Sequence, residues 1–426
     1  MKLTGNIKSK GTQTRRKRGI RKGFGSSRTL KNKRRRANPR KNAEENAEPG
    51  PSILDGGQYD FALPHILYPD TEAVAVTGAA INLLKVLIDE LLEDVDGSAN
   101  DLKVQSYVRH LSSDEFHSHF RMERSTFQDL INLIAPNIHD IKVAVERKIL
   151  ASLWLLGNNE TFQGVATRFS LNKGSLHKIV MEVFEAIHSK RQGFIVWPQG
   201  KELMDIADGF LRKTGFPGVV GIIDGTYIPI AGPRDKGATR AMYKNKNGIV
   251  SVQLQAICDN NMAFTDIVVG YPGSVLDGDV YCSTPTRQLV ESLPADYHVL
   301  ADQAYPLHSN LLVPFTDDEH ITHEERVFNR SHSLTRSEIG RAFARMKATF
   351  RRLNDLDIRK VELAPVIISA ACVLHNFILT REEVEYDDSP IDMDEYEPQY
   401  EGAVDYHNRL QAIDKRMKLG NMMSYN

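Results

Sequence analysis

The sequence predicts an α/β domain with a mixed sheet, behind an all-α region and between two charged tails. Three observations support this fold class. Strand-like and helical patterns alternate over residues 206–380, whereas residues 51–205 show helical periodicity only. Residues 1–50 are rich in Lys and Arg with few large apolar groups, and the tail over 381–426 turns acidic, with 11 acids and no Lys or Arg at 382–406. Such tails bury too little surface to offset chain entropy, so we expect both to be disordered.

The N-terminal tail is a basic arm. Residues 1–43 hold 17 Lys and Arg and no acid, which leaves 54 − 17 = 37 basic against 55 acidic residues elsewhere. This asymmetry favours nucleic-acid contact or nuclear import over a simple solvated tail. The two densest clusters fit a nuclear localisation signal, and their core residues are Arg15, Arg16, Lys17, Arg18, Lys33, Arg34, Arg35 and Arg36. We therefore expect the nucleus, with or without a cytoplasmic share.

The helical region ends in a helix-turn-helix pattern at 161–189. A short helix (162–168) and a longer amphipathic one (174–188) flank the turn "SLNKG". The second helix opens with Lys173, Ser175 and His177, which can reach phosphates or base edges in a major groove. A plain three-helix bundle explains the same pattern equally well.

Four strands and several helices are predicted in the α/β domain. An acid ends two of the strands: Asp224 precedes Gly225-Thr226, and Asp302 precedes Gln303-Ala304. The predicted strands are "GVVGIIDGTYIPI", "GIVSVQLQAICDN", "AFTDIVVGYPGS" and "YHVLADQAYP", and the main helices lie at 279–293, 332–353 and 364–379. The last of these is apolar but interrupted by His375 and Asn376, so we expect a buried helix and no membrane span.

Carboxylates at the ends of neighbouring strands can face one cleft. Oxygen ligands select Mg²⁺ or Mn²⁺, and with a third carboxylate such a site can activate water against a phosphodiester. Asp277, in "GYPGSVLDGDVY", could approach the same metals. The competing interpretation is that strand-end aspartates only cap turns. The three cysteines form no CxxC pair, so neither a zinc knuckle nor a disulfide framework is indicated.

Five blocks in one order resemble the PIF/Harbinger transposases and the Harbinger transposase-derived nucleases. The likeness spans residues 116–377 and rests on "IIDGTYIPI", "YKNKNGIVSVQLQAICD", "VVGYPGSVLDGDVY", "LADQAYPLHSNLLVPF" and "FNRSHSLTRSEIGRAFARMKATFRRL". It implies an RNase H-like DDE nuclease domain, divalent metal, DNA as substrate, and a Myb/SANT-like protein as assisting partner. Asp224 and Asp302 match the first two acids of the catalytic triad, and Asp277 matches a further characteristic acid.

The third acid is where the sequence departs from the family. The family glutamate falls on Gly340, with Arg341 and Phe343 matching after it, whereas Glu338 lies two residues early. Two residues are about 200° apart around a helix, so Glu338 should project away from the face of Gly340. Glu338 is the candidate third catalytic residue only if the helix rotates.

Three functions follow from these patterns. The first is a metal-dependent nuclease using Asp224, Asp302 and a third ligand. The second is a domesticated, catalytically inactive DNA- or chromatin-associated regulator, which Gly340 favours. The third is an adaptor that binds through its charged tails.

Overall fold

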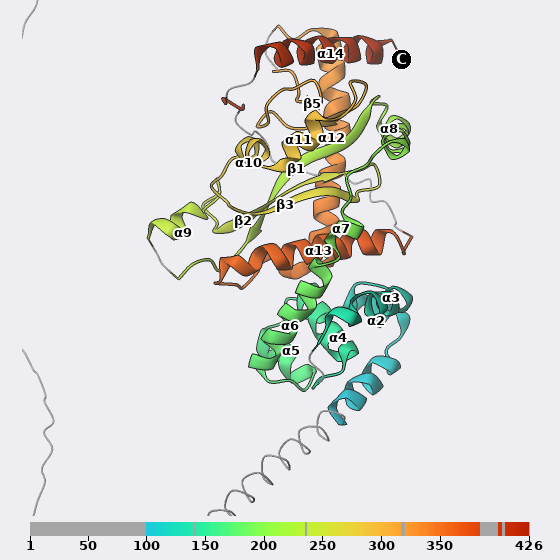
Figure 1. Cartoon of the computed structure of the whole chain (residues 1–426), viewed down its shortest axis with the longest axis vertical. Helices are drawn as coiled ribbons and strands as arrows, with labels where there is room; N and C mark the ends of the chain where they lie inside the picture. The colour runs from blue at the N-terminus through green and yellow to red at the C-terminus, as the bar shows by residue number, and fades with distance from the viewer. Residues whose placement is uncertain are drawn as a thin grey trace, which may run out of the picture. The chain divides into compact units, whose positions relative to one another are not determined.

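The computed structural model describes residues 99–139, 142–234, 237–316, 320–383, 399–402 and 405–425. Both predicted localisation clusters and residues 51–98 of the predicted helical region lie outside these residues. The described part combines an N-terminal helical region with a sheet domain (Figure 1).

The helical region begins with a helical stretch at 99–110 and continues to α7. Ser112 starts α2 with a capping box, because its side chain accepts from the Glu115 N–H while Glu115 accepts from the Ser112 N–H. The elements are α2 (Ser113–Phe120), α3 (Arg124–Ile134), η1 (Ala135–Asn137), α4 (Val145–Gly157), α5 (Phe162–Arg168), α6 (Lys173–His188) and α7 (Arg191–Phe194). The predicted helices at 162–168 and 174–188 therefore form.

Five strands make one mixed sheet in the order β3-β2-β1-β4-β5. β1 pairs antiparallel with β2 and parallel with β4, while β2–β3 is antiparallel and β4–β5 is parallel. The strands are β1 (Val219–Pro229), β2 (Ser251–Cys258), β3 (Phe264–Pro272), β4 (His298–Leu300) and β5 (Leu311–Leu312). The predicted mixed sheet is confirmed, and the short β5 is an addition to it.

Helices cover both faces of this sheet. The core on one face joins the sheet to α12 (His323–Thr349) and α13 (Ala364–Leu379). The core on the other joins it to α10 (Asp277–Ser283) and α11 (Pro285–Glu291). The remaining elements are α8 (Lys201–Thr214), α9 (Ala238–Met242), η2 (Arg351–Asn354), η3 (Val361–Leu363) and α14 (Tyr406–Ser424).

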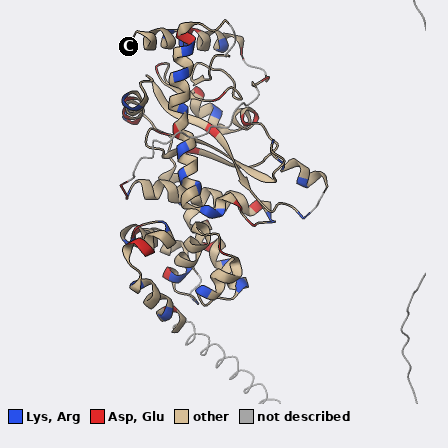
Figure 2. Cartoon of the chain, turned by 180° about the vertical axis from the view of Figure 1, so that it is seen from behind, with Lys and Arg blue, Asp and Glu red and all other residues tan. Residues whose placement is uncertain are grey.

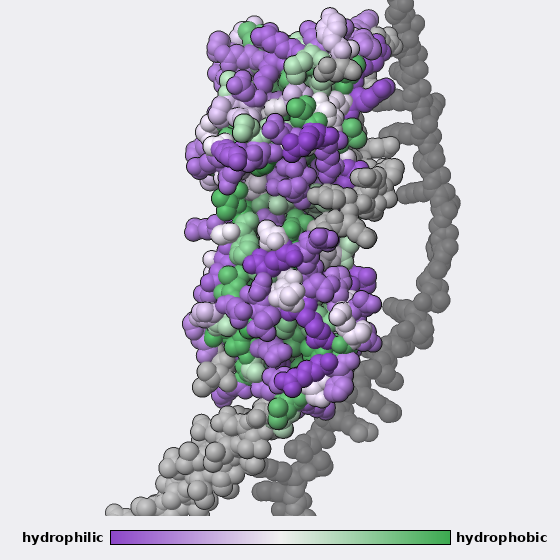
Figure 3. Space-filling model, turned by 90° about the vertical axis from the view of Figure 1, so that its right-hand side faces the viewer, coloured by the Kyte–Doolittle hydropathy of each residue, from purple (hydrophilic) through white to green (hydrophobic). Residues whose placement is uncertain are grey.

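α13 is the apolar helix of the sequence. Residues 361–379 are long and apolar enough to cross a membrane, but most of that stretch is buried inside the protein. His375 is buried within it and shares a hydrogen bond with the Met262 carbonyl. On the face drawn in Figure 3, hydrophobic side chains form small separate patches among hydrophilic ones. We therefore read α13 as a core helix.

The structure corrects the predicted borders in two places. The expected break at 205/206 falls inside α8, whose residues Leu203 and Ala207 pack in the sheet core. The tail predicted as disordered over 381–426 contains α14, which lies against α12 (Figure 1). Arg416 of α14 is buried and donates to the Val313 and Pro314 carbonyls. The acid-rich composition up to 406 hid this helix, because its own apolar pattern is weak.

Candidate active site

Asp224 and Asp302 lie side by side at one end of two parallel strands. Ile222 of β1 pairs with Leu300 of β4, so the acids, each two residues further on, stand level with each other. Neighbouring strands are about 4.8 Å apart and alternate residues share a face, so both carboxylates belong to one side of the sheet. We call them the strand-end acid pair. That the two carboxylates face one cleft stays a prediction.

Helix α12 packs beside the acid pair and presents Arg336 and Gly340 on the face nearest Asp224. Arg336 Nη1 lies 3.2 Å from Asp224 Oδ2, and Lys347 Nζ donates to Thr226 Oγ1 at 2.6 Å. Residues 336, 340 and 347 share one helical face, since they are separated by four and seven residues. Gly340 therefore lies between the two cations, on the face directed at Asp224. A carboxylate at position 340 would project at the acid pair, and this chain has none there.

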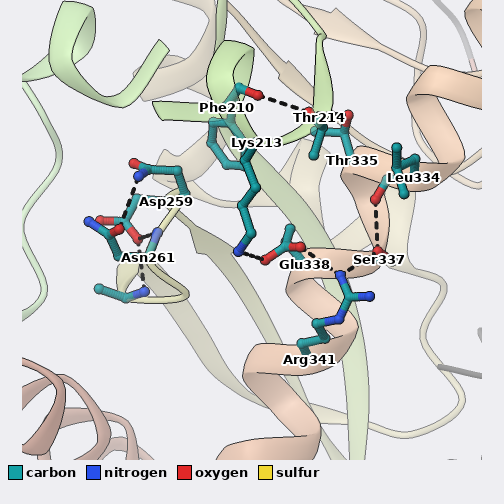
Figure 4. A network of polar contacts seen from close by, with 12 residues as sticks. Phe210, Lys213, Thr214, Asp259, Asn261, Leu334, Thr335, Ser337, Glu338 and Arg341 are labelled. Atoms are coloured by element: carbon teal, nitrogen blue, oxygen red, sulfur yellow. Dashed lines mark hydrogen bonds and ion pairs between the residues drawn. The ribbon is translucent and has the colours of Figure 1, made fainter. Parts of the chain in front are cut away.

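Glu338 lies on another side of α12 and meets other partners. Lys213 reaches from α8 to place Nζ 2.5 Å from Glu338 Oε2, and Arg341 Nη1 lies 2.6 Å from Oε1 (Figure 4). Only 2% of the Glu338 residue surface is exposed. Glu338 is thus a buried carboxylate held by two cations. The sequence offered no sign of Lys213, because α8 was not predicted.

Asp277 approaches β1 from the opposite face. A Cβ on Gly225 would come within 2.3 Å of Asp277 Oδ1, so this carboxylate fills the space beside Gly225. Gly225 faces away from the side of Asp224, because successive strand residues alternate. The Gln253 side chain donates to Asp277, and Gln255 Nε2 donates to the Asp277 carbonyl at 3.0 Å. Asp277 is therefore held near the acid pair but across the strand from Asp224.

Tyr305 lies at the junction of these acids. Its pKa is raised well above the usual value, first by burial and then by the negative charges of Asp277, Asp224 and Asp302. Gln255 Nε2 donates to the Tyr305 hydroxyl at 3.0 Å. No sequence pattern pointed to Tyr305. Its position three residues after the strand-end acid Asp302 was the available signal.

The residues present do not fit a site with three converging carboxylates. Within the described ranges, no group of three or more His, Cys, Asp or Glu side chains could hold a metal ion. Two of the expected ligands are present in register, Asp277 lies across the strand, and position 340 is a glycine. The roles of Asp224, Asp277, Asp302 and Glu338 in metal binding and catalysis stay predictions.

A short segment beyond the expected nuclease domain borders the site. The Tyr400 N–H donates to the Gln303 carbonyl at 2.9 Å, and the Tyr400 hydroxyl lies 3.3 Å from Cys282 Sγ. A Cβ on Gly278 would meet the Tyr400 ring. Residues 399–402 thus touch the neighbours of both Asp277 and Asp302. Nothing in the sequence patterns indicated this contact.

The predicted DNA-contacting residues lie at the start of α6. Asn172 caps this helix by accepting from the Ser175 N–H at 2.7 Å. Lys173 and His177 are exposed and Ser175 is half-buried. The His177 ring lies nearly parallel to Phe162 at 6.1 Å between centroids, so α5 supports it. Two of the three side chains are accessible, and DNA binding by them stays a prediction.

Comparison with known proteins agrees with this geometry. Residues 223–376 match the family described as DDE superfamily endonuclease. The chain is 31% identical to the putative nuclease HARBI1 of Mus musculus over 256 residues, which cover 58% of this chain and 71% of that protein. The chain belongs to the Harbinger transposase-derived nuclease family. The RNase H-like DDE fold expected from the resemblance accords with the mixed sheet and its helices.

Plant relatives match over a longer stretch at lower identity. Protein ALP1-like of Arabidopsis thaliana is 25% identical over 304 residues, covering 65% of this chain and 73% of that protein. A second Arabidopsis protein, named antagonist of like heterochromatin protein 1, is 25% identical over 311 residues, covering 65% and 76%. No solved structure gives a significant match. The chain is thus similar both to proteins named as nucleases and to a protein named for an effect on heterochromatin.

Proposed function

We propose that this protein binds DNA through a Harbinger nuclease fold in which phosphodiester cleavage is strongly reduced. One observation supports this best: on the α12 face directed at Asp224, the chain carries Gly340 where a carboxylate is expected and an Arg336–Asp224 ion pair beside it. DNA as the ligand follows from the family and from the predicted basic arm and α6 residues.

The ion pair bears directly on metal binding. The Arg336 guanidinium places a positive charge 3.2 Å from Asp224 Oδ2. A divalent cation at Asp224 would have to displace that charge or lie beside it. Without a carboxylate at position 340, fewer negative charges remain to compensate. The expected Mg²⁺ or Mn²⁺ is therefore bound weakly in our proposal.

Location and partners follow from the same assignment. The two basic clusters of residues 1–43 direct the chain to the nucleus, and a Myb/SANT-like protein supplies further DNA binding. A regulatory role at chromatin is the second candidate, favoured by the name of one plant relative, antagonist of like heterochromatin protein 1. A fully active nuclease that uses Asp224, Asp302 and Glu338 is the opposing possibility.

Nicking of a supercoiled plasmid in Mn²⁺ tests the proposal. We expect Gly340→Glu to nick up to roughly 100-fold faster than wild type, because groups that support a metal site typically contribute about 10- to 100-fold in metal affinity or activity. Gly340→Ala is the matched control for the change in helix propensity. Gly340→Glu combined with Arg336→Gln covers the case in which the new carboxylate pairs with Arg336.

The outcomes separate the possibilities. Nicking by wild type at the rate of Gly340→Glu, lost in Asp224→Ala, would show an active nuclease and overturn the proposal. Wild type that binds no plasmid or duplex would remove the DNA-binding half. Equal background nicking in all variants, with duplex binding intact, would assign the loss of cleavage to more than Gly340 and favour the regulatory role.

A further inference from the structure

A second feature of the sheet domain is a hollow where β1 runs out toward α9. Its volume is about 670 Å³. Four cationic residues line it, and the other lining residues are small: Arg234, Arg240, Lys244 and Arg359, with Ala231, Gly232, Pro233, Gly237 and Ala241. No acid and no large apolar side chain contributes to the described lining. The hollow is therefore a concentrated positive surface on a body that is acidic outside its N-terminal arm.

Backbone contacts fix the floor of this hollow. The Gly232 N–H donates to the Ile358 carbonyl at 3.1 Å, which ties the end of β1 to the chain after η2. Gly232 has φ +74°, and a Cβ there would come within 2.6 Å of Val250 Cγ1. Glycine is required at this position both for the left-handed backbone and for the close approach. The floor is thus preorganised rather than shaped by a ligand.

The cations differ in how they are held. Arg240 Nη1 donates to the Ala231 carbonyl at 2.6 Å and to the Pro233 carbonyl at 3.2 Å, so this guanidinium is fixed in the wall. Arg234, Lys244 and Arg359 are exposed. None of the four forms an ion pair within the described part of the chain. Figure 2 shows basic colour on α9, where Arg240 lies.

We propose that this hollow binds the phosphodiester backbone of DNA. Clustered guanidinium and ammonium groups recognise polyanions, and arginine matches phosphate geometry. A membrane surface fits less well, because no large apolar side chain lines the hollow. The inference deepens the proposed function and rests on it, since DNA is the polyanion that the family fold acts on.

The position along β1 fits one continuous DNA segment. Seven residues separate Asp224 from Ala231, which corresponds to about 23 Å of strand. That length spans about 7 base pairs of duplex. A duplex that reaches the acid pair can therefore place backbone phosphates in the hollow as well. The hollow is a positioning surface in this arrangement and contributes no reacting group.

Salt-dependent binding of a fluorescent 25-base-pair duplex to the full chain tests the proposal. The test variant is Lys244→Glu with Arg359→Glu, because both side chains are exposed and neither supports the fold through a described hydrogen bond. Each phosphate contact contributes about 0.9 to the slope of log K against log salt. We expect the slope to fall by about 2 and the affinity in 100 mM salt to fall roughly 10- to 100-fold.

A matched control carries the same change in charge elsewhere. Lys201→Glu with Lys418→Glu alters α8 and α14, which lie away from α9 in Figure 1. If both double variants lose equal affinity and slope, the effect is general electrostatics and the hollow is not a DNA site. If the test variant gains affinity, the hollow holds an acidic segment of the chain itself, and the proposal is wrong. Wild type that binds no duplex would instead remove the proposed function.

Discussion

Glu338 of α12 and Asp224 of β1 are both carboxylates paired with cations of α12, but they differ in burial and in the cations around them. Glu338 is almost fully buried between Lys213 and Arg341, whereas the Asp224 side chain is 16% exposed and forms an ion pair with Arg336. Burial with two close cations is the pattern of a structural ion pair, because an unpaired charge there would be costly. Partial exposure beside a long, flexible cationic side chain is the pattern of a carboxylate that can exchange that cation for another. The comparison separates the acid that supports the fold from the acid that could meet a substrate.

The largest expected effect is on the buried acid. Glu338→Ala should lower the free energy of unfolding by about 3 kcal/mol or more, because it leaves Lys213 and Arg341 without their common partner. Urea unfolding followed by circular dichroism measures this. Glu291→Ala, which removes the exposed Arg287–Glu291 pair, should cost about 0.5 kcal/mol. Equal losses in the two variants would contradict the structural assignment of Glu338.

Acidic pH should lower the free energy of unfolding through the buried His332 of α12. His332, one turn before Arg336 on α12, has its pKa lowered to about 3, first by burial and then by the Arg336 charge. The unfolded chain binds the proton more readily between that value and about 6.5, so stability is complete above pH 6.5 and falls as the pH drops. Between pH 6.5 and 5 this histidine alone accounts for about 2 kcal/mol.

The pH series has a direct check. His332→Phe removes the titrating group while keeping an aromatic ring beside Phe328. Its free energy of unfolding, measured in urea at several pH values, should fall less steeply below pH 6.5 than that of wild type. An unchanged slope would show that His332 does not contribute to the pH dependence of stability.

A smaller change in stability is expected at the partly exposed Arg336–Asp224 pair. Arg336→Gln should cost about 1 kcal/mol or less, because both partners keep some contact with water. The same variant should bind Mn²⁺ more strongly, since Asp224 loses its built-in cation. Thermal unfolding with and without MnCl₂ measures both effects, and Arg330→Gln, exposed on the same helix, is the matched control. A variant that Mn²⁺ stabilises no more than wild type would contradict the proposed competition between Arg336 and metal.

Much of this site could be predicted from the sequence. The strand ends located Asp224 and Asp302, and the helical repeat indicated that positions 338 and 340 face different ways. Arg336 was also within reach, because a residue four before Gly340 must share its face. What the patterns lacked was a reason to count an arginine among the residues of a metal site.

The partners of Glu338 could not be predicted in the same way. Lys213 is 125 residues away in the chain, and its meeting with Glu338 depends on how α8 packs against the sheet. The helix α14 and the contact of Tyr400 with Gln303 are likewise products of tertiary packing. From its composition this C-terminal region was predicted to be an acidic tail. Composition and periodicity describe a segment by itself and give no information on the part of the protein against which it packs.

The Arg336–Asp224 pair has a practical consequence for the behaviour of the folded protein. Converging carboxylates repel one another and usually depend on a dissolved cation for their stability. Here one of them carries its own counter-ion on a neighbouring helix. An ion pair within the protein therefore takes the place of a bound metal ion at Asp224. A trade-off between activity and stability predicts that such a change lowers activity and raises stability. Such a protein should stay folded in chelating buffers that would loosen a metal-dependent relative.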